Sequence, residues 1–92
     1  MEDVYNQLQF VIGKIREIRI KKSMSQLELS VNSNLSQSFL ASVEKGKKQP
    51  SVLTLLRIAS ALNVSPKAFF PENETKTKEE IKDIIINLVH SL

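Results

Sequence analysis

The side chains that could do chemistry in this 92-residue chain are mainly cations and amides. The chain has no cysteine, so a disulfide framework, a thiolate zinc site and a thiol nucleophile are all excluded. His90, the single histidine, lies near the C-terminus without a carboxylate or cysteine pattern that would complete a site. The sequence contains no glycine-rich phosphate loop and no acidic pair typical of a catalytic cleft. We therefore expect no enzymatic activity, no metal and no cofactor.

Positive charge is concentrated in the first 70 residues. Residues 1–70 hold ten Lys or Arg against five Asp or Glu, whereas residues 71–92 hold three against five. Such clustering is the electrostatic footprint expected of a protein that binds phosphates. No apolar run approaches the roughly 18 residues that a membrane span requires, and the acidic N-terminus is unlike a signal peptide. We therefore expect a cytoplasmic protein with no membrane partner.

Helical periodicity and capping residues predict an all-α chain. Apolar residues recur at helical spacing over about 4–20, which predicts a first helix there. Ser25 and Glu28 form a capping box that starts a short helix over about 26–32. Ser36 and Ser51 are the next caps, and they start helices over about 37–45 and 52–62.

A further turn opens at Ser65-Pro66, and Phe69 and Phe70 close the domain. Asn34 is the residue best suited to a left-handed turn between the second and third helices. The remaining large apolar residues of these helices are expected to form the core: Leu27 or Leu29, Phe39, Leu40, Val43 and the leucines of 52–62.

The last part of the chain is predicted to be a linker over 71–76 and an amphipathic helix over 77–92, following a domain of residues 1–70. The apolar residues of this helix fall on one continuous stripe: Ile81, Ile84, Ile85, Leu88 and Leu92. Such a stripe would be an exposed apolar patch without a partner. Dimerisation is the favoured interpretation, and folding back over the domain or fraying are the alternatives.

Five short sequence motifs lie between Met24 and Phe70, on the predicted helices and the turns that join them. They are Ser25-Gln26-x-x-Leu29, Leu35-Ser36-x-x-Phe39-Leu40, Val43-Glu44-Lys45-Gly46-Lys47, Pro50–Val64 and Phe69-Phe70. Together they resemble the Cro/repressor-like (XRE) helix-turn-helix family without gaps. The resemblance implies a five-helix, lambda repressor-like DNA-binding domain that precedes the C-terminal helix. Three positions depart from the family: Ser23 and Asn34 stand where it usually has glycine, and Ser30 stands where it usually has alanine. Ser30 is still small enough for the two helices to approach, and the departures leave the fold in place with a less stable turn.

The resemblance implies roles for individual residues. Gln37, Ser38 and Ser42 would read base edges in the major groove, with Ala41 beside them. Because glutamine can bond N6 and N7 of adenine and alanine can touch a thymine methyl group, we expect at least one A·T contact in each half-site. The expected phosphate contacts are Gln26, Ser36, Lys45, Lys47 and Lys48. Arg19 and Glu44 match a partly buried ion pair that ties the first helix to the recognition helix.

Several of these residues could instead have purely structural or solvent-exposed roles without any contact to DNA. Lys47 and Lys48 could belong to a solvated loop, and Ser36 could be a helix cap without a phosphate contact. The favoured function is a transcriptional repressor that binds a pseudo-palindromic operator in double-stranded DNA as a homodimer. The alternative is an antitoxin-type module whose C-terminal helix binds a protein partner and whose DNA binding is autoregulatory. RNA polymerase or a toxin is the protein partner that these two functions suggest.

Overall fold

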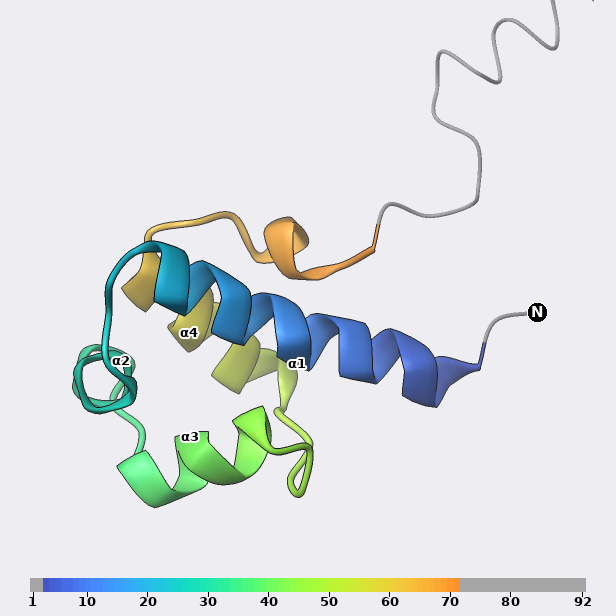
Figure 1. Cartoon of the computed structure of the whole chain (residues 1–92), viewed down its shortest axis with the longest axis horizontal. Coiled ribbons are helices and arrows are strands. Elements are labelled where there is room, and N and C mark those ends of the chain that lie inside the picture. Colours follow the sequence, from blue (N-terminus) through green and yellow to red (C-terminus); the bar gives the residue numbers. More distant parts are fainter. Residues whose placement is uncertain (1–2, 72–92) are drawn as a thin grey trace, which may run out of the picture.

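The computed structural model describes residues 3–71 as four α-helices followed by one short 3-10 helix. Its elements are α1 (Val4–Lys21), α2 (Gln26–Asn32), α3 (Gln37–Glu44), α4 (Val52–Leu62) and η1 (Pro66–Phe69). The long helix α1 lies across the molecule with α4 behind it, α2 is seen end-on, and α3 lies below α1 (Figure 1). The described residues contain no strand, which confirms the predicted all-α class. The predicted helix over 77–92 lies outside them.

Side-chain caps explain where the short helices begin. Ser25 Oγ accepts a hydrogen bond from the amide of Glu28 at 3.0 Å, and the Glu28 carboxylate accepts one from the amide of Ser25 at 3.4 Å, which completes the predicted capping box. Ser36 Oγ accepts from the amide of Phe39 at 3.1 Å, and Ser51 Oγ accepts from the amide of Thr54 at 3.0 Å. Each cap stabilises its helix by about 1 kcal/mol. The predicted bounds of α2 and α4 are confirmed, and α3 ends one residue earlier than predicted.

The core forms where all five elements meet. Each element contributes one side chain that is completely buried in a single apolar cluster: Ile15 from α1, Leu29 from α2, Leu40 from α3, Ile58 from α4 and Phe69 from η1. Burying a side chain of this size stabilises a fold by about 2 kcal/mol. The cluster therefore holds the two short helices α2 and α3 against the longer helices α1 and α4.

Some of the leucines considered for the core lie on the surface. Leu29 rather than Leu27 is buried in α2, and Leu27 is 54% exposed. The prediction that all leucines of α4 are core was wrong, because Leu53 is 58% and Leu56 is 47% exposed. The buried residues of α4 are Thr54, Ile58, Ala59 and Leu62, which share the face that meets the other helices. Phe39 is only half-buried, and Phe70 is exposed although Phe69 is buried.

Three non-glycine residues adopt the left-handed conformation at the ends of helices or in turns. Their φ angles are +54° at Ser23, +57° at Asn34 and +56° at Asn63. Asparagine tolerates this region better than serine does, because its side chain can hydrogen-bond locally. Two of the three, Ser23 and Asn34, are positions where the resemblance leads us to expect a glycine. The strain should therefore be greatest at Ser23.

We expect Ser23→Gly to raise the free energy of unfolding by about 0.5 kcal/mol. Glycine relieves the left-handed strain of the folded state, and this gain exceeds the loss that comes from the greater conformational entropy of glycine in the unfolded chain. Ser60→Gly is the matched control, since Ser60 is an exposed residue within α4. There the same change should lower stability by about 0.5 kcal/mol. Urea denaturation of both variants measures the two effects, and two changes of the same sign would contradict this account.

Candidate nucleic-acid interface

The turn between α2 and α3 sets the angle at which α3 leaves the bundle. Asn34 takes the left-handed conformation there, and the amide of Leu35 donates to the carbonyl of Ser30 at 2.8 Å. Ser30 is itself buried, and its hydroxyl donates to the carbonyl of Leu27 at 2.7 Å. A small, internally bonded side chain at this point lets α2 and α3 approach closely. The pair of helices and its turn form a helix-turn-helix arrangement.

The outward face of α3 is polar and uncharged. Gln37 and Ser38 are exposed, whereas Ala41 and Ser42 are half-buried. These four predicted base-reading residues have the spacing i, i+1, i+4 and i+5, so they share one side of the helix. The core residues Leu40 and Val43 occupy the opposite side. The structure therefore brings the four predicted residues together on one surface.

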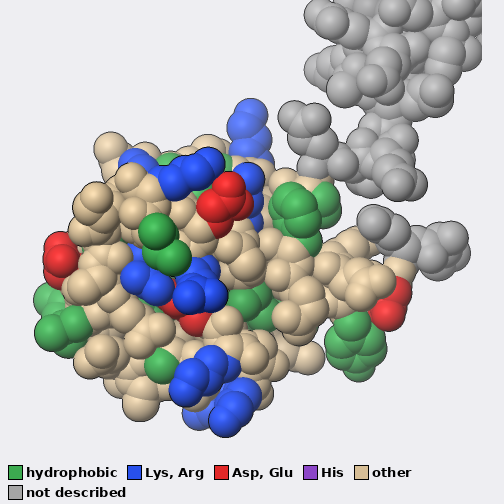
Figure 2. Space-filling model, viewed as in Figure 1, with side chains coloured by type: hydrophobic (Ala, Val, Ile, Leu, Met, Phe, Trp, Pro, Cys, Tyr) green, Lys and Arg blue, Asp and Glu red, His purple; other side chains and the backbone are tan. Residues whose placement is uncertain are grey.

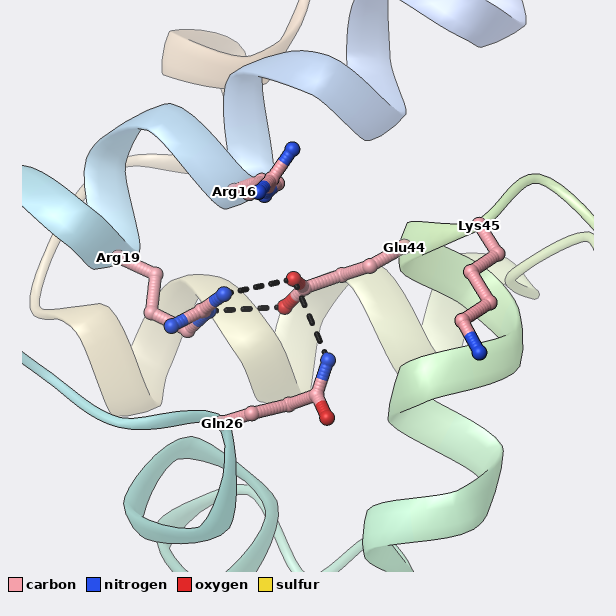
Figure 3. Close-up of a pocket in the computed structure, with 5 residues that line it drawn as sticks. All are labelled: Arg16, Arg19, Gln26, Glu44 and Lys45. Carbon is pink, nitrogen blue, oxygen red and sulfur yellow. Dashed lines mark hydrogen bonds and ion pairs between the residues drawn. The ribbon is translucent and has the colours of Figure 1, made fainter.

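An ion pair between Arg19 and Glu44 joins α1 to the end of α3 (Figure 3). Arg19 Nε donates to Glu44 Oε2 at 2.9 Å, and Arg19 Nη2 donates to Glu44 Oε1 at 2.8 Å. The side chains are only 12% and 4% exposed. Arg19 Nη1 also donates to the carbonyl of Met24 at 3.0 Å, and Gln26 Nε2 donates to Glu44 Oε1 at 3.5 Å. The pair therefore connects the end of α3 to the end of α1, to the loop that follows α1 and to the start of α2.

Lysines surround the end of α3. Lys45, Lys47 and Lys48 are all exposed. The amides of Lys47 and Lys48 both donate to the carbonyl of Ser42, at 2.8 and 3.3 Å, which holds the loop beside the helix. The ammonium group of Lys48 lies 5.6 Å from the centre of the Phe39 ring, within the range of a cation–π contact. Lys and Arg side chains gather on this side of the molecule, over α1 and near the end of α3 (Figure 2).

Two lysines of α1 are compensated by a carboxylate. Glu17 lies 3.3 Å from Lys14 and 3.1 Å from Lys21. The ammonium groups of Lys21 and Lys14 hold the pKa of the Glu17 carboxyl below its usual range. Their charges are therefore partly balanced on the surface of α1. The cations near α3 have no such carboxylate partner among residues 3–71, apart from Arg19.

One residue near the interface was not predicted from the sequence. Arg16 lines a hollow of about 270 Å³ together with Arg19, Gln26, Glu44 and Lys45 (Figure 3). Arg16 lies one helical turn before Arg19, so both side chains can reach the same side of α1. That spacing was the available signal. It did not reveal that the end of α3 forms the facing wall.

Among the described residues, no helix is long and apolar enough to cross a membrane. The same part of the chain holds no group of His, Cys, Asp or Glu that could bind a metal ion.

Comparison with known proteins matches the same elements. A model of the helix-turn-helix family (HTH_3) matches residues 15–69. The immunity repressor of Bacillus phage phi105 is 39% identical over 67 residues, which cover 73% of this chain and 46% of the repressor. Control protein C.BamHI of Bacillus amyloliquefaciens is 34% identical, over 67% of this chain and 79% of that protein. The chain thus spans less than half the length of the phage repressor.

A solved structure shows the same fold. The restriction-modification controller protein C.AhdI from Aeromonas hydrophila superposes with a TM-score of 0.66 at 33% identity. The superposition covers 68% of this chain and 96% of the controller. The repressor-like arrangement predicted from the sequence is therefore confirmed for the described helices.

We expect Glu44→Gln to lower the free energy of unfolding by about 3 kcal/mol, because it leaves the largely buried Arg19 guanidinium without a counter-charge. The double variant Arg19→Met, Glu44→Leu removes both charges and fills the site with apolar atoms. It should therefore recover most of that loss. Thermal denaturation of the single and double variants tests this, and a double variant less stable than Glu44→Gln would show that the pair itself supplies net stability.

Proposed function

This chain belongs to the Cro/repressor-like (XRE) helix-turn-helix family of DNA-binding transcriptional regulators, and from that premise we propose that it is a cytoplasmic repressor that binds a pseudo-palindromic operator as a homodimer. One observation carries the proposal. The solvent-facing side of α3 is an uncharged hydrogen-bonding surface, and lysines stand directly at its end. A helix of this kind can enter the major groove while the lysines contact the phosphates beside it.

Sequence recognition is assigned to Gln37, Ser38, Ala41 and Ser42. Gln37 is the first residue of α3 and is exposed, as expected for a recognition helix that meets base edges near its N-terminus. Its amide nitrogen can donate to N7 of one adenine while its amide oxygen accepts from N6 of the same base, and Ala41 can pack on a thymine methyl group. We therefore propose an A·T pair opposite this part of α3 in each half-site.

Positioning on the DNA is assigned to residues around α3 that carry no sequence information. Lys45, Lys47 and Lys48 are exposed, and none of them forms an ion pair with a carboxylate of residues 3–71. Gln26 and Ser36 begin the two helices of the motif, and Gln26 is braced by Glu44 while Ser36 caps α3. We propose that these five residues contact the DNA backbone.

Dimerisation is assigned to the apolar stripe of the predicted C-terminal helix, which lies outside the described residues. Its members are Ile81, Ile84, Ile85, Leu88 and Leu92. A single recognition helix reads only a few base pairs, so a two-fold dimer with half-site centres about 34 Å apart would supply the needed affinity and specificity. The names of the similar proteins, an immunity repressor and two control proteins, support a regulatory role of this kind.

The proposal is tested by selecting genomic fragments with the purified full chain and footprinting the enriched site. We expect a protected pseudo-palindrome, and we expect Gln37→Ala to bind it about 10- to 100-fold more weakly while no longer preferring adenine at one position. Lys47→Gln is the control, since it should weaken the selected and scrambled duplexes alike. Salt-sensitive binding that enriches no sequence would contradict the assigned function.

Dimerisation has its own test in sedimentation of the full chain. The wild-type protein should sediment as a dimer, and Ile84→Glu should shift it to a monomer and weaken operator binding, because a charge on the stripe opposes burial. Lys82→Glu also adds a negative charge to this segment but off the stripe, so it should leave the dimer intact. A wild-type monomer would instead favour a different protein partner for this helix.

A further inference from the structure

We propose that Arg16 and Lys45 hold a single phosphate of the DNA backbone between them, in the hollow between α1 and the end of α3. The inference rests on the proposed function and adds to it a residue and a site. Arg16 and Lys45 belong to different helical segments, yet both line this hollow (Figure 3). The other residues that line it are Arg19, Gln26 and Glu44.

The charges around the hollow favour an anion. Its lining carries three cations and one carboxylate, Glu44. Both oxygens of that carboxylate are already occupied by Arg19, and one of them also accepts from Gln26. Within residues 3–71 no carboxylate is left to neutralise Arg16 or Lys45. The hollow therefore presents two uncompensated positive charges.

Arg16 has no carboxylate partner within residues 3–71, although a carboxylate is close to it in the sequence. Glu17 is the next residue, but its oxygens pair with Lys14 and Lys21. Those two lysines are balanced along the outer surface of α1, whereas Arg16 lines the hollow instead. A guanidinium can give a phosphate two parallel hydrogen bonds, and an ammonium group adds a compact charge from the other side.

The position of the hollow identifies the phosphate as one of DNA. Lys45 follows Ala41 by four residues and Gln37 by eight, so it continues the base-reading face of α3 by one more turn. The hollow thus borders that face at its far end. When α3 occupies the major groove, the sugar-phosphate backbone runs along the edge of the groove, where Lys45 and Arg16 can meet it.

The test compares binding of Arg16→Gln, Lys45→Gln and the double variant to the selected operator over a range of salt concentrations. Arg57→Gln is the matched control, because Arg57 is an exposed arginine of α4 away from the hollow. Arg16→Gln should weaken binding about 3- to 10-fold at 0.1 M salt, and Arg57→Gln should not. All four proteins should keep the wild-type melting temperature, since the changed residues are exposed.

The salt dependence of binding then gives the number of DNA phosphates that Arg16 and Lys45 neutralise. If both cations neutralise one phosphate, the double variant should lose about 0.9 from the slope of log K against log salt, whereas two separate phosphates would give about 1.8. Replacing phosphates one at a time by methylphosphonate should reveal one position at which neither substitution has any further effect. An Arg16→Gln variant that binds like Arg57→Gln, or a loss near 1.8, would overturn the shared site.

A failure of the proposed function can be distinguished from a failure of the shared phosphate site. If no operator is enriched, the same slopes are measured on a duplex of arbitrary sequence, where the phosphate site should still be seen. Inorganic phosphate, followed by NMR of the Arg16 and Lys45 side chains, distinguishes a free anion from DNA. Binding of inorganic phosphate with unchanged DNA slopes would overturn the assignment to the DNA backbone.

Discussion

The arrangement of the helices depends on the ion pair between Arg19 and Glu44. Helices α2 and α3 have seven and eight residues, and isolated helices of that length are not stable in water. The core cluster holds them in place, but apolar contacts alone do not fix the rotation of a short helix. The two parallel hydrogen bonds from Arg19 fix it at the C-terminal end of α3, and the third guanidinium nitrogen secures the loop before α2. A charge buried this far requires such complete bonding.

The same pair shapes the electrostatics of the surface. An unpaired carboxylate at Glu44 would stand next to the base-reading face and would repel phosphates. Because Arg19 and Gln26 occupy its oxygens, the charges that remain around the end of α3 among residues 3–71 are those of Arg16, Lys45, Lys47 and Lys48. One interaction therefore both positions α3 and leaves its surroundings positive.

Local signals in the sequence were sufficient to predict the helices. Features that depend on contacts between residues far apart in the sequence could not be predicted in this way. The caps at Ser25, Ser36 and Ser51 are set by residues three positions away, so their helix starts could be predicted. The exposure of Leu53 and Leu56 could not, because periodicity gives an apolar stripe without saying how much of it the other helices cover. Arg16 and Lys45 are 29 positions apart, so the hollow appeared only with the fold. The base-reading and phosphate assignments rest on family resemblance and on the placement of the residues around α3.

Recognition by this chain would depend on a fixed distance between two sets of residues. The anchors are the residues proposed to contact phosphates, and the readers are the residues of α3 proposed to contact bases. The four proposed readers are uncharged, and each good base contact discriminates by only about 1–3 kcal/mol. Most of the affinity must then come from phosphates, which carry no sequence information. Phosphate contacts help specificity only when they hold α3 in one register. Here the amides of Lys47 and Lys48 donate to the carbonyl of Ser42, a proposed reader, so the anchoring loop and the reading helix are bonded to each other. A shift of the loop along the backbone would therefore carry the readers with it.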